Sequence, residues 1–523
     1  MEFDKFFFFG AKNGVFMPPK VSNHATHGNG NGHGDSPPRL KTVTRGDVTA
    51  HSAVAPKSAV TFQMSGGFEI RGTPVHLTRH RVAFEIPGAD AGLRASEVLN
   101  GFKIIAGGRT VFQGRAVVSG LHHAGARVVC EATLDEGEET KIPFAGNAGF
   151  LDAYHTFFGK WQNQAKLPTE FKTAVFDLQS YLSDLKLLLG RMETAVAASA
   201  SSNRAEMESR VFHDLSPAIL SSVDALHRRF EIAAGKISPD AREAAQTLVH
   251  RRLHPLFLCA PFGHRTYHKP LGHAGDYEIM NMIHRNTFEG ESWFAKMVHY
   301  WLVNQWAAKS VRNRVAYMKA ALASETARIF REKRPARILN LGCGPAREVR
   351  EFISESPLAD RAEFTLVDFD AETIDYVAST LAEANRRHER RAQIQTRRVS
   401  VAQLIKNMSS PSQKPAAGFD LIYCGGLFDY LTDQTCRQLV HLFYEWLAPG
   451  GRIIAANMNH EHKPFHQMVE YLLDWHLIYR GARDLASFAP EAASADDWSV
   501  VSEPLAVNFF LEVRKPEKTD ACP

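Results

Sequence analysis

One stretch of the C-terminal half decides the fold, and it reads ILNLGCGP over residues 338–345. Residues 338–341 predict a short buried strand, and residues 349–353 continue with an apolar pattern that is typical of a helix. Gly342 and Gly344 stand at the turn between the two, where glycine permits a tight backbone. The first N–H groups of the helix are then free to donate to a ligand. The stretch therefore predicts a ligand-binding turn between a strand and a helix.

A second apolar strand, residues 364–367, ends in Asp368. Gly342 and Asp368 are 26 positions apart, which is the length of one strand–helix–strand unit in a doubly wound sheet. A carboxylate at this strand end can accept hydrogen bonds from both hydroxyls of a ribose. Arg347 occupies the place of the third glycine in the dinucleotide fingerprint. This departure favours S-adenosylmethionine (SAM), which has no diphosphate, over a dinucleotide.

Residues 335–515 resemble the class I SAM-dependent methyltransferases. Residues 341–345 match the first motif of that family, and residues 367–370 match the second. The resemblance implies a Rossmann-like α/β domain with SAM as cofactor, and packing of Phe369 on the adenine. The cofactor-binding residues that it implies are Gly342, Cys343, Gly344, Pro345, Asp368, Phe369, Ser400, Val401, Cys424 and Gly425.

Further landmarks of the same fold follow in order. A third strand is expected over residues 396–401, a fourth with its exit over 419–426, and a fifth over 452–456 after a Pro-Gly-Gly turn. A late strand over 507–513 could complete the sheet. The carboxyl end of the fourth strand should border the methyl group that is transferred.

The substrate should lie outside the carboxyl ends of the strands, where residues 457–463 form a polar, basic cluster. A hydroxyl or amine acceptor needs a base, and His460 is the candidate by position. A carboxylate acceptor needs no base but favours cationic partners such as His462, Lys463 or Arg265. The alternative is that His460 and His462 are solvated loop residues.

Residues 256–334 are rich in glycine, histidine and aromatic residues, and we expect them to form a lid and helical extension of the catalytic domain. Tyr277 is the second catalytic candidate, near the sulfonium. The alternative is a loop that only caps a hydrophobic core. Residues 269–278 and 311–314 resemble bacterial extracellular-factor biosynthesis methyltransferases, which are linked to hydroxypalmitic acid methyl ester. That resemblance implies a fatty-acyl carboxylate as acceptor.

The N-terminal third reads as three segments. Residues 1–60 are expected to be a disordered tail, in which Met17 could serve as the start instead of Met1. Residues 61–140 show the strand rhythm of a small barrel and resemble a PilZ domain. Neither cyclic di-GMP motif of that family is intact around Arg79, so a structural or protein-contact barrel is favoured over nucleotide binding. Residues 145–255 predict a helical bundle, because Phe171 to Leu189 carry an apolar stripe.

Composition excludes several classes of protein. The 523 residues carry a formal net charge of only +4, which argues against nucleic-acid binding despite basic pairs at 386–398. Six cysteines without a Cys-x-x-Cys pair favour a reduced, cytoplasmic protein without a metal site. No run approaches the roughly 18 apolar residues of a membrane span, and no signal peptide is recognised.

The sequence thus predicts a multidomain enzyme that consists of a small PilZ-like β-barrel, a helical bundle and a doubly wound methyltransferase domain. Its expected partner is a small-molecule or lipid-like acceptor. The alternative is a regulatory protein that binds cyclic di-GMP or another protein, with a methyltransferase domain that only binds SAM.

Overall fold

The computed structural model describes residues 58–517 except 64–68, 79, 88–91, 107–108, 125–126, 136–153, 156–157, 160, 199–202, 407–417 and 462–465. The expected tail over 1–60 therefore lies almost wholly outside the described residues. So do Arg79, His462 and Lys463. In the part of the chain that the structure describes, no helix combines the length and apolar character needed to cross a bilayer.

Seven strands at the N-terminal end form a barrel: β1 (Ala59–Gln63), β2 (Glu69–Leu77), β3 (Arg81–Pro87), β4 (Val98–Ala106), β5 (Arg109–Gln113), β6 (Ala116–Ala124) and β7 (Arg127–Leu134). Six of them close a ring in the order β1-β2-β3-β7-β6-β4, because β4 pairs back onto β1, and β5 adds to β4. The core contains Phe62, Phe84 and Phe102, whose ring centroids lie 5.7–6.2 Å apart. The expected barrel is present, and its likeness to a PilZ domain stays a prediction.

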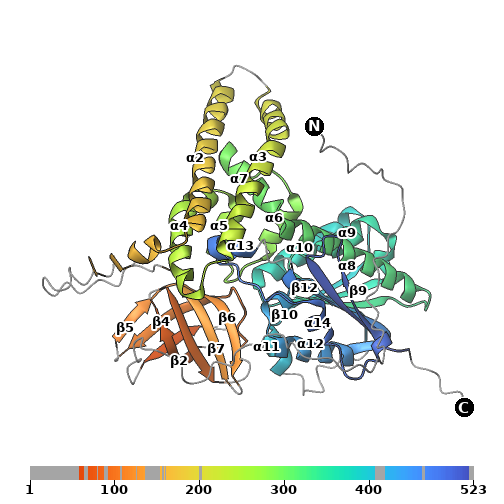
Figure 1. The fold of residues 1–523 in the computed structure, drawn as a ribbon. Helices are drawn as coiled ribbons and strands as arrows, with labels where there is room; N and C mark the ends of the chain where they lie inside the picture. The colour runs from red at the N-terminus through yellow and green to blue at the C-terminus, as the bar shows by residue number, and fades with distance from the viewer. Residues whose placement is uncertain are drawn as a thin grey trace, which may run out of the picture.

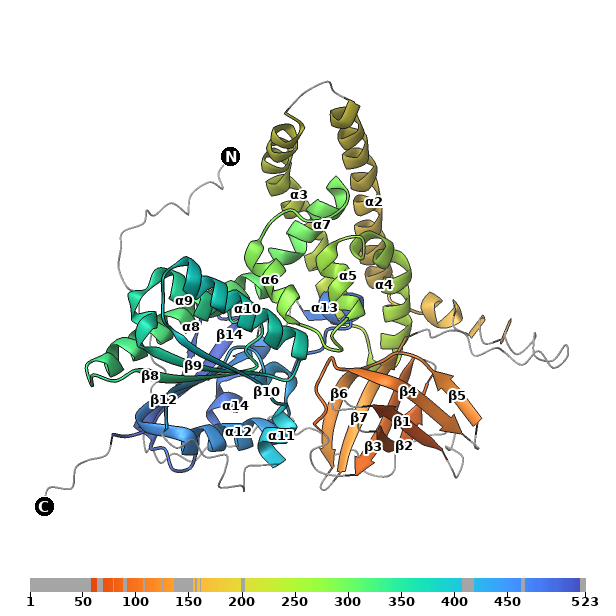
Figure 2. The ribbon, with the colours of Figure 1, turned by 180° about the vertical axis from the view of Figure 1, so that it is seen from behind.

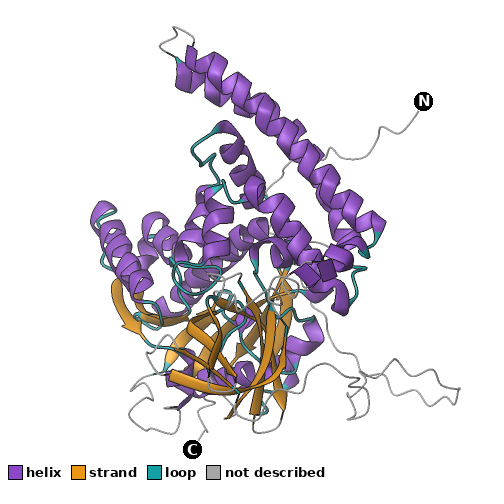
Figure 3. Ribbon diagram, turned by 90° about the vertical axis from the view of Figure 1, so that its left-hand side faces the viewer, coloured by secondary structure: helices purple, strands orange, loops and turns teal. Residues whose placement is uncertain are grey.

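A helical region follows the barrel and lies above both the barrel and the sheet (Figures 1 and 2). Its helices are α2 (Thr169–Ala198), α3 (Arg204–Ala234), α4 (Arg242–Phe257), α5 (Pro261–His268), α6 (Tyr277–Arg285), α7 (Trp293–Val303) and α8 (Trp306–Phe330). The apolar stripe from Phe171 to Leu189 is buried, as its helical spacing predicted. Helices α2 and α3 form an antiparallel pair whose far end projects away from the rest of the molecule (Figure 1). Most of the helices lie above the strands in the side view as well (Figure 3).

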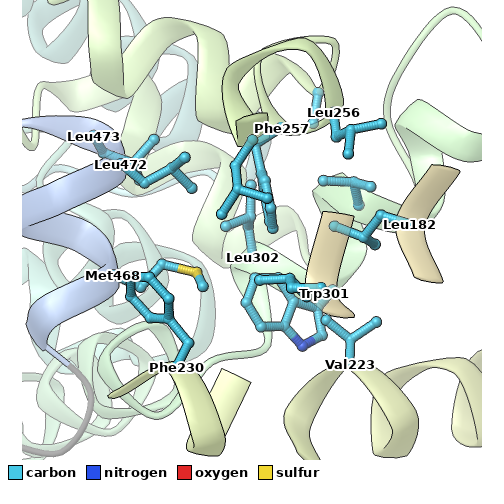
Figure 4. Packing of buried hydrophobic residues seen from close by; sticks show 14 of the residues in the cluster. Leu182, Val223, Phe230, Leu256, Phe257, Trp301, Leu302, Met468, Leu472 and Leu473 are labelled. Carbon is cyan, nitrogen blue, oxygen red and sulfur yellow. The ribbon is translucent and has the colours of Figure 1, made fainter. Parts of the chain in front are cut away.

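The core of the helical region includes a helix from much later in the chain. Helix α13 (His466–Leu473) inserts Met468, Leu472 and Leu473 among the apolar side chains of the N-terminal helices, such as Phe257 and Leu302 (Figure 4). The three α13 side chains are at most 3% exposed. One helix of the C-terminal domain is therefore part of the core of the helical region, while the sheet of that domain packs against clusters of its own.

The C-terminal domain is built on a seven-stranded sheet with the order β10-β9-β8-β11-β12-β14-β13. Its strands are β8 (Ala336–Leu341), β9 (Ala362–Asp368), β10 (Gln393–Arg398), β11 (Phe419–Cys424), β12 (Leu447–Met458), β13 (Trp498–Ser502) and β14 (Asn508–Arg514). The first five are parallel to one another, with Leu339 opposite both Thr365 and Ile422. Strand β14 runs antiparallel between β12 and β13, so the expected late strand does complete the sheet.

Helices cover both faces of this sheet, as a parallel sheet that is apolar on both sides requires. Helices α8, α9 (Arg347–Glu355) and α10 (Ala371–Arg387) cover one face. Helices α11 (Val401–Lys406), α12 (Asp433–Trp446) and α14 (Ala482–Ala486) cover the other. The carboxyl ends of β8, β9 and β11 meet the helical region, and this junction contains the site described next.

Candidate active site

A cavity of about 260 Å³ lies outside the carboxyl ends of β8, β9 and β11. This is the edge at which doubly wound sheets bind their ligands. The sheet side of the cavity contains the glycine turn at residues 342–345 and the strand end at Asp368 and Phe369. Helices α6, α7 and α8 line the opposite side, and Arg94 reaches it from the barrel. The segment expected to form a lid therefore borders the cavity.

The glycine turn has the backbone that the sequence predicted. Gly342 and Gly344 have φ values of +68° and +49°, in the region that residues with side chains rarely adopt. A Cβ atom at Gly342 would lie 3.3 Å from the Cβ of Leu427, so a side chain there would also crowd the wall. The turn is fixed because Gly342 N and Cys343 N donate to the carbonyl of Val367, over 2.8 and 3.1 Å.

Asp368 is buried at the end of β9 and is held by three backbone amides. Its Oδ1 accepts from Phe369 N at 2.8 Å and from Asp370 N at 3.2 Å, and its Oδ2 accepts from Gly344 N at 3.1 Å. A carboxylate has about four acceptor positions, so one remains for a ligand hydroxyl. The side chain links the glycine turn to β9 and can still bind a ribose.

The structure brings most of the expected site residues to this one cavity. Those that line it are Gly342, Cys343, Gly344, Pro345, Asp368, Phe369, Val401, Gly425 and Tyr277. Ser400, Cys424 and His460 are not among the lining residues.

Each of these three side chains has another position. Ser400 caps α11, since its Oγ accepts from Gln403 N while Gln403 Oε1 accepts from Ser400 N, a reciprocal arrangement. Cys424 is fully buried within β11. The ring of His460 lies against the backbone of Gly481, where a Cβ would come within 2.4 Å of it. Their assigned roles in binding or catalysis stay predictions.

The cavity wall also carries two oppositely charged groups that the sequence did not single out, Arg314 on α8 and Glu348 on α9. Glu348 accepts hydrogen bonds from Asn340 Nδ2 at 3.0 Å and from Tyr423 Oη at 2.7 Å. Burial raises the pKa of Glu348 and lowers that of Arg314. The Arg314 guanidinium donates no hydrogen bond to another residue in the described part of the chain, and it forms no direct ion pair with Glu348. A ligand with one carboxylate and one ammonium group would suit this pair.

Asp429 is a buried acid on the same wall, just after the fourth strand. Its Oδ1 accepts from Met458 N at 2.7 Å. Burial raises the pKa of Asp429 to about 6, although Arg314 opposes the shift. A carboxyl group with a pKa close to neutrality can exchange protons with a bound acceptor.

The segment that is expected to act as a lid, residues 256–334, is anchored through the start of α6. Asp276 caps this helix, because its Oδ1 accepts from Glu278 N and Ile279 N, both at 3.0 Å. Arg265 donates to both carboxylate oxygens of Asp276 at 2.9–3.0 Å, so its charge is already paired. The hydroxyl of Tyr277 donates to Glu372 Oε1 on α10 at 2.7 Å. These bonds tie the lid to the sheet domain.

Apolar side chains from the helical region form a further part of the wall. Met280 and Ile283 from α6, Leu302 from α7, Val311 from α8 and Leu473 from α13 all border the cavity. Ile283 and Leu473 are at most 2% exposed. Since apolar surface favours apolar ligands, this half of the cavity suits a hydrocarbon group.

Comparison with protein families matches residues 339–453 to a methyltransferase domain. These residues run from β8 into β12 and carry the glycine turn, Asp368 and the end of β11. The match confirms the expectation of a methyltransferase domain, and with it SAM as the cofactor. A search of curated proteins finds no match.

Several solved structures are similar to parts of the chain. One is described as a possible exported protein from Bordetella parapertussis, with 17% identity over 58% of this chain and 97% of that one, at a TM-score of 0.37. The N-methyltransferase NodS from Bradyrhizobium japonicum WM9, in complex with S-adenosyl-L-homocysteine (SAH), is 14% identical over 46% and 98%, at 0.27. The magnesium protoporphyrin IX methyltransferase from Synechocystis PCC 6803, with bound SAH, is 12% identical over 48% and 97%, at 0.29.

Proposed function

We propose that this protein is a class I SAM-dependent methyltransferase that esterifies the carboxylate of a small fatty-acyl acceptor. The observation that carries the proposal is the division of one cavity into two halves. One half offers the glycine turn, Asp368 and a pair of buried charges, and the other half carries a group of apolar side chains from the helical region. A polar cofactor and a hydrocarbon acceptor would meet between them.

The residues of the polar half fit SAM group by group. Asp368 retains one acceptor position, which would bind one ribose hydroxyl. Arg314 and Glu348 suit the carboxylate and ammonium groups of the methionine part, because among the described residues Glu348 is bonded only to the neutral donors Asn340 and Tyr423 and each buried charge would gain an oppositely charged group. The cofactor supplies an electrophilic methyl group on a sulfonium. The protein must then hold the acceptor in line with that group and exclude water.

The apolar half supports an acyl acceptor. A carboxylate is ionised at neutral pH, so it can attack a methyl group without losing a proton to a base. Such a reaction needs no general base, and its rate depends mainly on how the acceptor is positioned against the methyl group. A hydroxyl or amine acceptor would instead need a base. For that case His460 stays a prediction, and Asp429 is an acidic side chain on the cavity wall whose pKa is raised to about 6.

The test is methyl transfer by the purified full chain with SAM that carries a labelled methyl group. Carboxylic acids of increasing chain length are offered, and products are identified by mass spectrometry. We expect a labelled methyl ester whose yield rises with chain length, since each buried methylene adds about 0.8 kcal/mol. The Asp368→Ala variant should lose the product.

The matched control for that variant is Asp375→Ala, which removes an exposed carboxylate on α10 outside the cavity. It should retain the wild-type yield. A labelled ether or methylamine from a hydroxylated or amino analogue, with no ester from any acid, would contradict the proposed acceptor. No binding of SAM at all would contradict the proposed enzyme.

A further inference from the structure

The N-terminal barrel reaches the methyltransferase cavity through the segment Leu93–Glu97, which precedes β4. Its backbone is bonded to the other parts of the chain: Ala95 N donates to the carbonyl of Tyr430 at 3.2 Å, and Val98 N donates to that of Gly272 at 2.7 Å. Ser96 and Glu97 are 0% and 4% exposed. The segment is therefore part of the molecule's interior, between the barrel, the lid and the sheet domain.

Ser96 fixes the course of this segment. Its φ is +61°, in the left-handed region that is unfavourable for a residue with a side chain. The conformation is held because Ser96 Oγ donates to the carbonyl of His476 at 2.8 Å and accepts from His476 N at 2.5 Å. Strained backbone of this kind persists where surrounding contacts determine it, and such residues cluster at functional sites.

This turn places Arg94 on the cavity wall. Its guanidinium carbon lies 3.7 Å above the centroid of the Phe369 ring, which is stacking distance. Arg94 N donates to Glu97 Oε2 at 3.0 Å, while the Nε of Arg94 is 3.9 Å from the same oxygen. The guanidinium of Arg94 donates no hydrogen bond to any other residue that the structure describes. Its N–H groups are thus available to a ligand in the cavity.

His273 of the lid lies on the same aromatic ring, with centroids 5.0 Å apart and the planes at 60°. Its Nδ1 lies 3.2 Å from the carbonyl of Ala274, so the proton must be on Nδ1. Burial, reinforced by the Arg94 charge, lowers the pKa of His273, and the ring is neutral. Its Nε2 is then an acceptor, and it is buried with no partner in the described part of the chain.

We propose that Arg94 of the barrel and His273 of the lid complete the adenosine subsite, and we call these residues together with Phe369 the adenosine clamp. This inference rests on the proposed use of SAM. Adenosine offers ring nitrogens that accept hydrogen bonds and an amine and hydroxyls that donate them. Arg94 supplies the donors, His273 the acceptor, and Phe369 the flat apolar contact. The barrel is therefore a working part of the cofactor site, positioned by Ser96.

The test compares two ligands by calorimetric titration of the full chain. SAH contains adenosine and the amino-acid part, whereas 5′-methylthioadenosine lacks the amino-acid part. We expect Arg94→Ala to weaken both ligands by the same factor, about 5- to 30-fold. Arg314→Met should weaken SAH much more than methylthioadenosine. Arg127→Ala, an exposed arginine on β7 of the same barrel that pairs with Glu85, is the matched control and should change neither.

The outcomes separate the inference from the proposed function. Wild-type protein that binds neither ligand overturns both. Wild-type protein that binds SAH, together with unchanged or tighter binding by Arg94→Ala, overturns only the clamp, because Arg94 would then be irrelevant or in the way. The variant Arg94→Lys keeps the charge without the flat guanidinium, and wild-type affinity in that variant would also overturn the stacking role.

A second measurement does not depend on substituting Arg94. If the clamp closes on adenosine, either ligand should slow hydrogen exchange of the amides of Ala95 and Val98, which bond across the domain junction. Amides of β2, on the other side of the barrel ring from β4 and β6, serve as the reference. Equal exchange with and without ligand at Ala95 and Val98 would overturn the coupling between barrel and cofactor.

Discussion

The substitution Asp368→Asn tests the cofactor site most directly, because it keeps the size of the side chain and removes only its charge and one acceptor. The asparagine oxygen would face the two amides of Phe369 and Asp370, as Oδ1 does now. Its NH₂ group would then face Gly344 N, so a donor would meet a donor where Oδ2 now accepts. The glycine turn loses its anchor and the ribose loses a charged acceptor.

The magnitude follows from these bonds. A hydrogen bond to a charged group contributes about 1.5–3 kcal/mol. Losing one such bond to a ribose hydroxyl should weaken SAH binding roughly 10- to 150-fold. Losing the bond to Gly344 N should lower the free energy of unfolding by about 1–3 kcal/mol, since a buried amide is left unpaired. Both quantities are accessible, by calorimetry with SAH and by urea unfolding, with Asp375→Asn as control.

If Asp368→Asn folds with wild-type stability and binds SAH within threefold of the wild type, then Asp368 neither holds the turn nor binds the ribose. A stability loss without an affinity loss would leave Asp368 as a structural residue only, and the ribose would have to bind elsewhere.

Four further predictions follow from single groups. Tyr277→Phe removes the hydroxyl that donates to Glu372. It should reduce turnover severalfold by loosening the lid, while the circular dichroism spectrum stays unchanged. Full turnover in this variant would mean that the bond does not hold the lid. Gly342→Ala puts a Cβ 3.3 Å from Leu427 at a φ of +68°, and should weaken SAH binding at least tenfold; wild-type affinity would argue against a tight cofactor turn. Burial raises the pKa of Asp429 to about 6, so between about pH 4 and 6 the folded chain binds a proton that the unfolded chain has lost. The free energy of unfolding should therefore fall as the pH rises from about 4 to 6. Asp429→Asn should flatten this fall when unfolding by urea is measured at each pH. Burial lowers the pKa of Lys269 to about 7, so between about pH 7 and 10 the unfolded chain binds one more proton at this side chain than the folded chain does. The free energy of unfolding should therefore rise across that pH range in the wild type but not in Lys269→Met.

The sheet and its ligand turn could be predicted from sequence because they depend on local signals. A strand, two glycines, a helix and a carboxylate at the next strand end lie within one short stretch, and each has a backbone reason to be where it is. The helix from Phe171 to Leu189 was equally accessible, since its burial follows the helical period.

The other walls of the cavity could not be predicted in this way. Arg94 and Phe369 belong to different domains, and no local sequence pattern around either residue predicts that they are in contact. Arg314 was named only within residues 311–314, as part of a family resemblance, and its side chain was given no role, because its burial depends on how α8 packs across the sheet. Ser400 was predicted to bind the cofactor, and that role stays a prediction; its Ser-x-x-Gln spacing is also typical of a helix cap, and the structure has that cap.

Helix α13 has a consequence for how the chain is made. Its side chains Met468, Leu472 and Leu473 fill the interior of helices that leave the ribosome hundreds of residues earlier. Until His466–Leu473 has been synthesised, those earlier helices have an open apolar groove, which is the kind of surface that aggregates or recruits chaperones. Expression of residues 58–460 alone should therefore yield insoluble protein, whereas adding the last segment should restore solubility.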